Sequence, residues 1–148
     1  MYKRVMDYSW IIYALLSALT AGLVAIFGKL GLEGIDSHTA TAIRAIIMAV
    51  FLVGVIMVQG KLQNIKPILL NSKALFYIAM SGVAGALSWL FYFVALKHGK
   101  VSQIVPIDRM SVVFALLLAF FFLGEKVSLK TAAGAALVVV GGIIIALG

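Results

Sequence analysis

Five long apolar stretches decide which folds are open to this chain. They lie at about residues 10–30, 39–58, 74–96, 101–123 and 129–147. A helix needs about 20 mostly apolar residues to cross the hydrocarbon core of a bilayer, and each stretch is long enough to do so. The sequence therefore predicts an all-α integral membrane protein, a bundle of five transmembrane helices that forms one domain over residues 1–148.

The composition is that expected of a chain embedded in a lipid bilayer. Apolar residues make up 64% of the chain and charged residues 11%, whereas an ordinary soluble domain has about 25% charged residues. The net charge of +7 is spread singly between apolar runs, so it forms no clustered basic patch of the kind that binds nucleic acid. We expect the lipid bilayer, and no nucleic acid, among its partners.

The sequence carries no signature of an enzyme. It has no cysteine, and its two histidines lie in predicted connections rather than in a ligand cluster. No phosphate-binding glycine loop or nucleophile motif is present, and the connections are too short to hold a catalytic domain. We therefore expect no enzymatic activity, no bound metal and no cofactor.

Basic residues in the connections predict the orientation. Seven lie on the side of the N-terminus and three on the opposite side, and Lys and Arg favour the cytoplasmic face. We expect a multi-pass protein of a cell's inner or plasma membrane, with a cytoplasmic N-terminus and an external C-terminus. The first group is Lys3, Arg4, Lys61, Lys66, Lys73, Lys126 and Lys130, and the second is Lys29, Lys97 and Lys100.

Three charged residues lie well inside predicted helices, away from the helix ends. Asp108 and Arg109 lie seven to eight residues into the fourth stretch and Arg44 about five into the second, which places them roughly 8–12 Å below the same membrane face. Such charges cost about 2.5–3.5 kcal/mol each on insertion scales, so they usually mark function. They are candidate substrate-binding residues. Asp108, the one acidic group predicted to lie deep, is the candidate for ion coupling.

The partners of these charges are open at this stage. Asp108 and Arg109 are adjacent, so on a helix they point about 100° apart and do not pair easily. Arg44 is the obvious partner for Asp108, which would leave Arg109 to face a water-filled cavity or an anionic ligand. The alternative is that both arginines extend their long stems to lipid headgroups, which the shorter Asp108 cannot do.

An aromatic stripe lies in the same half of the membrane. Trp89 and Tyr92 follow Gly85 and Ser88 at helical spacing, and aromatics beside charges line cavities or clamp a substrate; an interfacial aromatic belt is the alternative. Pro106 precedes the charged pair. It marks either a helix break near mid-depth, where transporters often place a site, or the entry turn of the fourth helix.

These features together resemble the EamA-type domain of the drug/metabolite transporter superfamily, over essentially the whole chain. Residues 88–97 read SWLFYFVALK, residues 99–108 read GKVSQIVPID and residues 122–126 read FLGEK, followed by a glycine-rich last helix. Typical members have ten helices in two halves of inverted topology, so this chain is similar to one half, as in the small five-helix bacterial and archaeal branch. The usual later proline of the fourth helix is absent, so substrate rules of ten-helix members are not carried over.

The resemblance implies a secondary transporter of a small polar or anionic metabolite, driven by an ion or proton gradient. Five short helices enclose little volume, so we expect a homodimer. Small residues four apart, such as Ala18 and Gly22, serve either packing within one bundle or a dimer seam. Two other hypotheses are a non-transporting membrane subunit of a larger complex and a flippase-like carrier of a lipid-linked headgroup.

Overall fold

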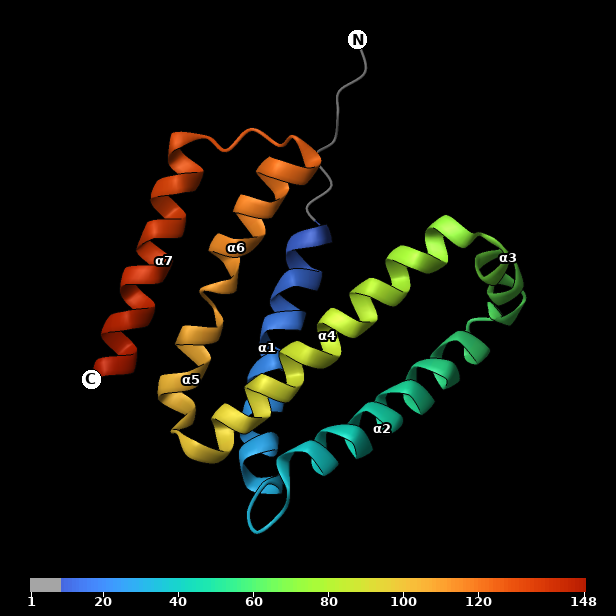
Figure 1. The fold of residues 1–148 in the computed structure, drawn as a ribbon, viewed down its shortest axis with the longest axis horizontal. Helices are drawn as coiled ribbons and strands as arrows, with labels where there is room; N and C mark the ends of the chain where they lie inside the picture. The colour runs from blue at the N-terminus through green and yellow to red at the C-terminus, as the bar shows by residue number, and fades with distance from the viewer. Residues whose placement is uncertain (1–8) are drawn as a thin grey trace.

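The computed structural model describes residues 9–148, which form helices joined by short connections (Figure 1). Five helical segments are long and apolar enough to cross a membrane, and each begins and ends within two residues of a predicted stretch. The predicted fold class is therefore confirmed. The spans are α1 (Ser9–Gly31), α2 (Ser37–Val58), α4 (Ser72–His98), the fourth span Val101–Leu123, and α7 (Leu129–Leu147).

The fourth span is broken in its middle. It consists of α5 (Val101–Asp108), a turn at Arg109 and Met110, α6 (Ser111–Leu118) and a wider turn of π-helix, η2 (Ala119–Leu123). Pro106 lies inside α5 and has no N–H to donate. The helix then tightens, because the Met110 N–H bonds the Ile107 carbonyl three residues back, at 3.0 Å. The break thus follows the proline by three residues.

The connection between α2 and α4 contains helical structure of its own. It holds a 3₁₀ turn, η1 (Leu62–Asn64), and one short helix, α3 (Ile65–Leu70).

Three of the long helices begin at a side chain that accepts a hydrogen bond from a backbone N–H of the first turn, which satisfies a donor that the helix leaves free. These are Asp36 for α2, Asn71 for α4 and Ser128 for α7. The Thr39 N–H, 2.8 Å from the Asp36 carboxylate, lowers the pKa of that group.

The small buried core lies where α1 crosses α4. Leu32, Phe93 and Leu96 are buried against one another. Gly28 permits the close approach, because a Cβ atom there would stand 2.8 Å from the Phe93 ring. In Figure 1, α5, α6 and α7 lie on one side of α1, and the α2–α4 arm lies on the other.

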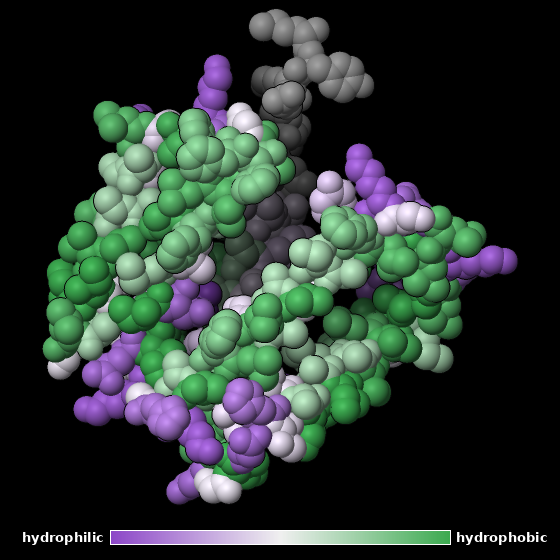
Figure 2. Space-filling model, in the orientation of Figure 1, coloured by the Kyte–Doolittle hydropathy of each residue, from purple (hydrophilic) through white to green (hydrophobic). Residues whose placement is uncertain are grey.

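The bundle has two ends, which we name by what they carry. The α3 end holds the connection from α2 to α4 and the connection at residues 124–128; the C-terminal end holds the α1–α2 and α4–α5 connections and Gly148. Figure 2 shows hydrophilic residues gathered at these ends, with hydrophobic surface between them. This is the distribution expected of a chain that spans a bilayer.

Lysines tie the C-terminal end together. The Lys29 ammonium in the last turn of α1 donates to the carbonyls of Leu96 and Gly99, at 2.6 and 2.9 Å. Lys97 donates to the Ile35 carbonyl at 3.1 Å. These bonds fix α1 and the α1–α2 connection to the point where α4 passes into α5.

Candidate functional site

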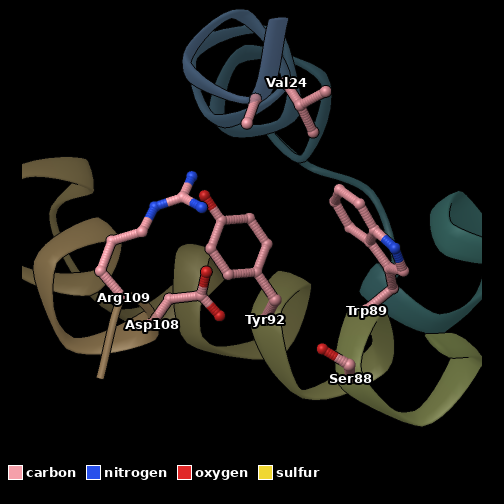
Figure 3. Close-up of a pocket in the computed structure, with 7 residues that line it drawn as sticks. Val24, Ser88, Trp89, Tyr92, Asp108 and Arg109 are labelled. Carbon is pink, nitrogen blue, oxygen red and sulfur yellow. The ribbon is translucent and has the colours of Figure 1, made fainter. Parts of the chain in front are cut away.

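A cavity of about 130 Å³ lies between α1, α4 and α5, at the break in the fourth span. Figure 3 shows Asp108 and Arg109 extending toward Tyr92, which lies between them and Trp89. Figure 2 shows hydrophilic atoms recessed between apolar surfaces on this side of the molecule. Four of the five predicted binding residues therefore line one cavity. The full lining is Ala21, Val24, Ser88, Trp89, Tyr92, Asp108 and Arg109.

Local helix geometry brings these side chains together. Trp89 and Tyr92 are three residues apart on α4, so they share a face, and their rings meet edge to face with centroids 5.8 Å apart. Asp108 ends α5, and Arg109 lies in the turn that follows. Asp108 lies seven residues beyond the start of α5, roughly 10 Å by helical rise.

Among residues 9–148, no ion pair neutralises either charge of the cavity. Within residues 9–148, no Lys, Arg or His side chain makes an ion pair with the Asp108 carboxylate. Asp108 is half-buried and Arg109 is exposed. The cavity thus offers one acid and one guanidinium to a ligand, beside two aromatic rings and the Ser88 hydroxyl.

Arg44 lies elsewhere. Its guanidinium carbon is 3.6 Å from the centroid of the Trp89 ring and 4.3 Å from that of Phe93, and Arg44 does not line the cavity that holds Asp108. The expected ion pair between Arg44 and Asp108 is not formed, because α2 packs along α4 and Arg44 meets the rings of that helix first. A cation over an aromatic face is stabilised by the ring quadrupole.

Sequence reasoning missed Phe93 and the role of Lys29. Phe93 follows Trp89 by four residues, so the same helical spacing that linked Trp89 to Gly85 would have placed it on this face. No comparable signal marks Lys29, because its acceptors Leu96 and Gly99 are backbone carbonyls some 70 residues away.

Within residues 9–148, no group of three His, Asp or Glu side chains is arranged to hold a metal ion.

Five apolar spans, three of which line a charged cavity, define a multi-pass α-helical membrane protein. Residues 8–147 match the EamA-like transporter family, and the chain belongs to that family. The resemblance seen in the sequence is therefore confirmed, and the family is one of transporters rather than enzymes.

A relative from Sinorhizobium sp supports the assignment. It is described as an uncharacterized transporter in the cobO 3' region, and it is 36% identical over 141 residues, which are 95% of this chain and 99% of the relative. The two proteins therefore correspond over nearly their whole lengths. No solved structure matches this chain.

Proposed function

We propose that this chain is a half-size secondary transporter, which moves a small polar or anionic metabolite and works as a homodimer driven by an ion or proton gradient. The five spans act as a single domain in the inner or plasma membrane. The observation that carries the proposal is the meeting of Asp108 and Arg109 with Trp89 and Tyr92 in one cavity, within spans that are mostly apolar.

The state of the two charges supports transport over a purely structural role. A packing subunit would hold such charges paired and dry, because an unpaired buried charge is strongly destabilising. Asp108 has no ion-pair partner among residues 9–148, and the Arg109 side chain is exposed. Charges left free at this depth are available to a substrate or to a coupling ion.

We assign a separate task to each charged side chain of the cavity, Arg109 and Asp108, from its chemistry. Arg109 presents a planar guanidinium, which suits a carboxylate or phosphate group. Asp108 can alternate between a charged and a neutral form, so we assign it the coupling proton or cation. Solute binding and ion binding would then share one cavity, which is the simplest way to couple them.

The dimer follows from how little the single chain encloses. The cavity is small and open, and seven glycines on long helices have no neighbouring atom within 4 Å of a built Cβ, so those surfaces are free to meet another helix closely. A second copy would complete the walls of a translocation path. The seven glycines are Gly22, Gly31, Gly54, Gly82, Gly85, Gly134 and Gly141.

The test is solute-driven proton movement in liposomes that contain the purified protein and a trapped pH-sensitive dye. The panel is a set of amino acids, dicarboxylates and sugar phosphates, with the membrane potential clamped. We expect at least one compound to move protons, and Asp108→Asn to abolish that movement. Arg109→Gln should weaken uptake of anionic compounds more than that of neutral ones.

Glu125→Gln is the matched control for the loss of a carboxylate, because Glu125 lies in the connection before α7 and outside the cavity. It should transport like the parent protein. Full proton-coupled uptake by Asp108→Asn would contradict the assignment of the coupling group. Absence of uptake for every compound, with correctly folded protein, would favour a non-transporting subunit.

A further inference from the structure

The strongest unexplained feature of the molecule is the Arg44 guanidinium. Its Nε atom is buried, and no residue of the described part of the chain accepts a hydrogen bond from it. Within the same residues 9–148, Arg44 makes no ion pair. A cation inside a membrane span is costly without a partner, so something outside these residues must neutralise it.

The contacts of Arg44 leave part of the guanidinium free for a ligand. The Trp89 and Phe93 rings lie against the group, with centroids 3.6 and 4.3 Å from the guanidinium carbon. These cation–π contacts hold the guanidinium near the two rings, and no residue of 9–148 accepts a hydrogen bond from it. The N–H donors of the group are therefore left for an acceptor.

Two cavities reach Arg44. One, of about 380 Å³, is bounded by α1 and α2 and includes Thr20 and Phe93 in its lining. The other, of about 440 Å³, lies between α2 and α4 and adds His38 and Thr41. Neither lining contains an aspartate or a glutamate. Both volumes are ample for a carboxylate or phosphate group, and the α2–α4 cavity supplies more polar groups.

The Trp89 ring divides Arg44 from the cavity already described. Trp89 lines both the Asp108 cavity and the α2–α4 cavity, whereas Arg44 lines only the latter of these two and Asp108 only the former. An anion bound at Arg44 would therefore be separate from one bound at Arg109, although both would touch the same indole.

We propose that Arg44 forms a second oxyanion site, which binds a carboxylate or phosphate group on the side of Trp89 opposite Asp108 and Arg109. A bidentate oxyanion accepts hydrogen bonds from free N–H donors of the guanidinium and neutralises its charge. The role of this site in transport rests on the proposed function, but its existence does not, and binding is measured without any gradient.

Trp89 is a built-in reporter for this site. The chain has two tryptophans, so Trp10→Phe leaves Trp89 as the sole source of indole emission. In that background, inorganic phosphate or acetate is titrated against the protein in dodecyl maltoside micelles, at constant ionic strength with chloride as the reference anion. We expect a saturable change in Trp89 emission, because the anion binds a guanidinium 3.6 Å from the ring.

Variants separate the two sites. Arg44→Gln should raise the half-saturating concentration by roughly tenfold or more, the usual effect of losing a charged hydrogen-bonding partner. Arg44→Lys keeps the charge but lacks the planar fork, so its half-saturating concentration should fall between those of the parent protein and Arg44→Gln. This variant provides the test if Arg44→Gln folds poorly. In Arg109→Gln the part of the response that depends on Arg44 should remain. Lys130→Gln, which removes a cation that lines none of these cavities, is the matched control and should leave the titration unchanged.

The source of the oxyanion is distinguished in the same micelles, which contain no phosphate. A response to free phosphate or acetate identifies a soluble anion, and a response to added phosphatidylglycerol alone identifies a lipid headgroup. Loss of the response in Arg109→Gln with retention in Arg44→Gln would overturn the second site, as would no response to any of these anions. Failed transport with intact binding contradicts the proposed function alone; intact transport without binding contradicts this site alone.

Discussion

At the scale of single residues, the Lys29 side chain joins the end of α1 to the end of α4. Its half-buried ammonium donates to two carbonyls, those of Leu96 and Gly99. The last carbonyls of a helix lack intrahelical donors and carry partial negative charge. Lys29 therefore caps the end of α4 from a neighbouring helix, and it stabilises the crossing of α1 with α4.

Replacing Lys29 by Met should destabilise the protein by about 1.5–3 kcal/mol, the usual range for hydrogen bonds to a charged group. Denaturant unfolding in detergent, followed by circular dichroism, measures the change. Lys97→Met is the control, because the exposed Lys97 makes one such bond, at 3.1 Å, and a smaller loss is expected. Equal losses from both substitutions would refute a special role for Lys29.

The sequence alone was enough to predict four residues that line the cavity, but not the position of Arg44 outside it. Trp89 and Asp108 share a depth below one membrane face, and helix periodicity with a known start is enough to show this. Depth does not reveal on which side of α4 a side chain lies. Depth therefore favours Arg44 as the partner of Asp108, although α2 brings Arg44 to the Trp89 ring and outside the cavity that holds Asp108.

At the scale of helices, α7 packs closely against the broken fourth span. Gly142 is buried, and a Cβ atom there would stand 3.0 Å from the Pro106 carbonyl oxygen. That oxygen belongs to backbone, which does not rotate away as a side chain would. The neighbouring Gly141 has nothing within 4 Å of a built Cβ. One glycine of the pair thus sets the distance between α5 and α7.

These adjacent glycines provide a matched experiment. Gly142→Ala should destabilise the protein by about 1–3 kcal/mol, as overpacking usually does. Gly141→Ala should be neutral or stabilising by less than about 1 kcal/mol, because alanine has the higher helix propensity. Thermal unfolding of both variants in the same detergent gives the comparison. The contact would be shown unimportant if both variants unfolded like the parent protein.

Helix-level prediction was reliable for existence and length, and less so for interruptions. Each span is specified by about 20 apolar residues, a signal that needs no tertiary information. Pro106 indicated a disturbance, but the turn lies at Arg109 and Met110, where the backbone relaxes after the lost hydrogen bond. Which glycine of the last helix faces α5 depends on the rotation of α7, and composition does not determine that.

At the scale of the whole molecule, the ends of the bundle differ in charge. The described part of the α3 end carries five lysines and the C-terminal end three; Lys3 and Arg4, counted earlier with the first group, lie outside the described residues. The difference favours a cytoplasmic α3 end and an external C-terminus. The five lysines are Lys61, Lys66, Lys73, Lys126 and Lys130.

Reporter fusions after Gly148 test this orientation. Alkaline phosphatase, active outside, should give the signal, and green fluorescent protein, fluorescent inside, should give little. Fluorescence alone would refute the predicted orientation. Comparable signals from both reporters would show that copies insert in both directions, which an inverted homodimer requires. A change of Lys66 and Lys73 to Gln should then shift the ratio toward an internal C-terminus.

The Lys29 contact also has a consequence for the order in which the protein is made. Its acceptors follow it by 67 and 70 residues, so α1 is synthesised long before Leu96 and Gly99 leave the ribosome. Until α4 has entered the bilayer, the Lys29 ammonium lacks both of these acceptors. The first span must therefore insert before the third span can stabilise it. A chain whose synthesis stops between them would lack the bonds that fix α1 to the end of α4.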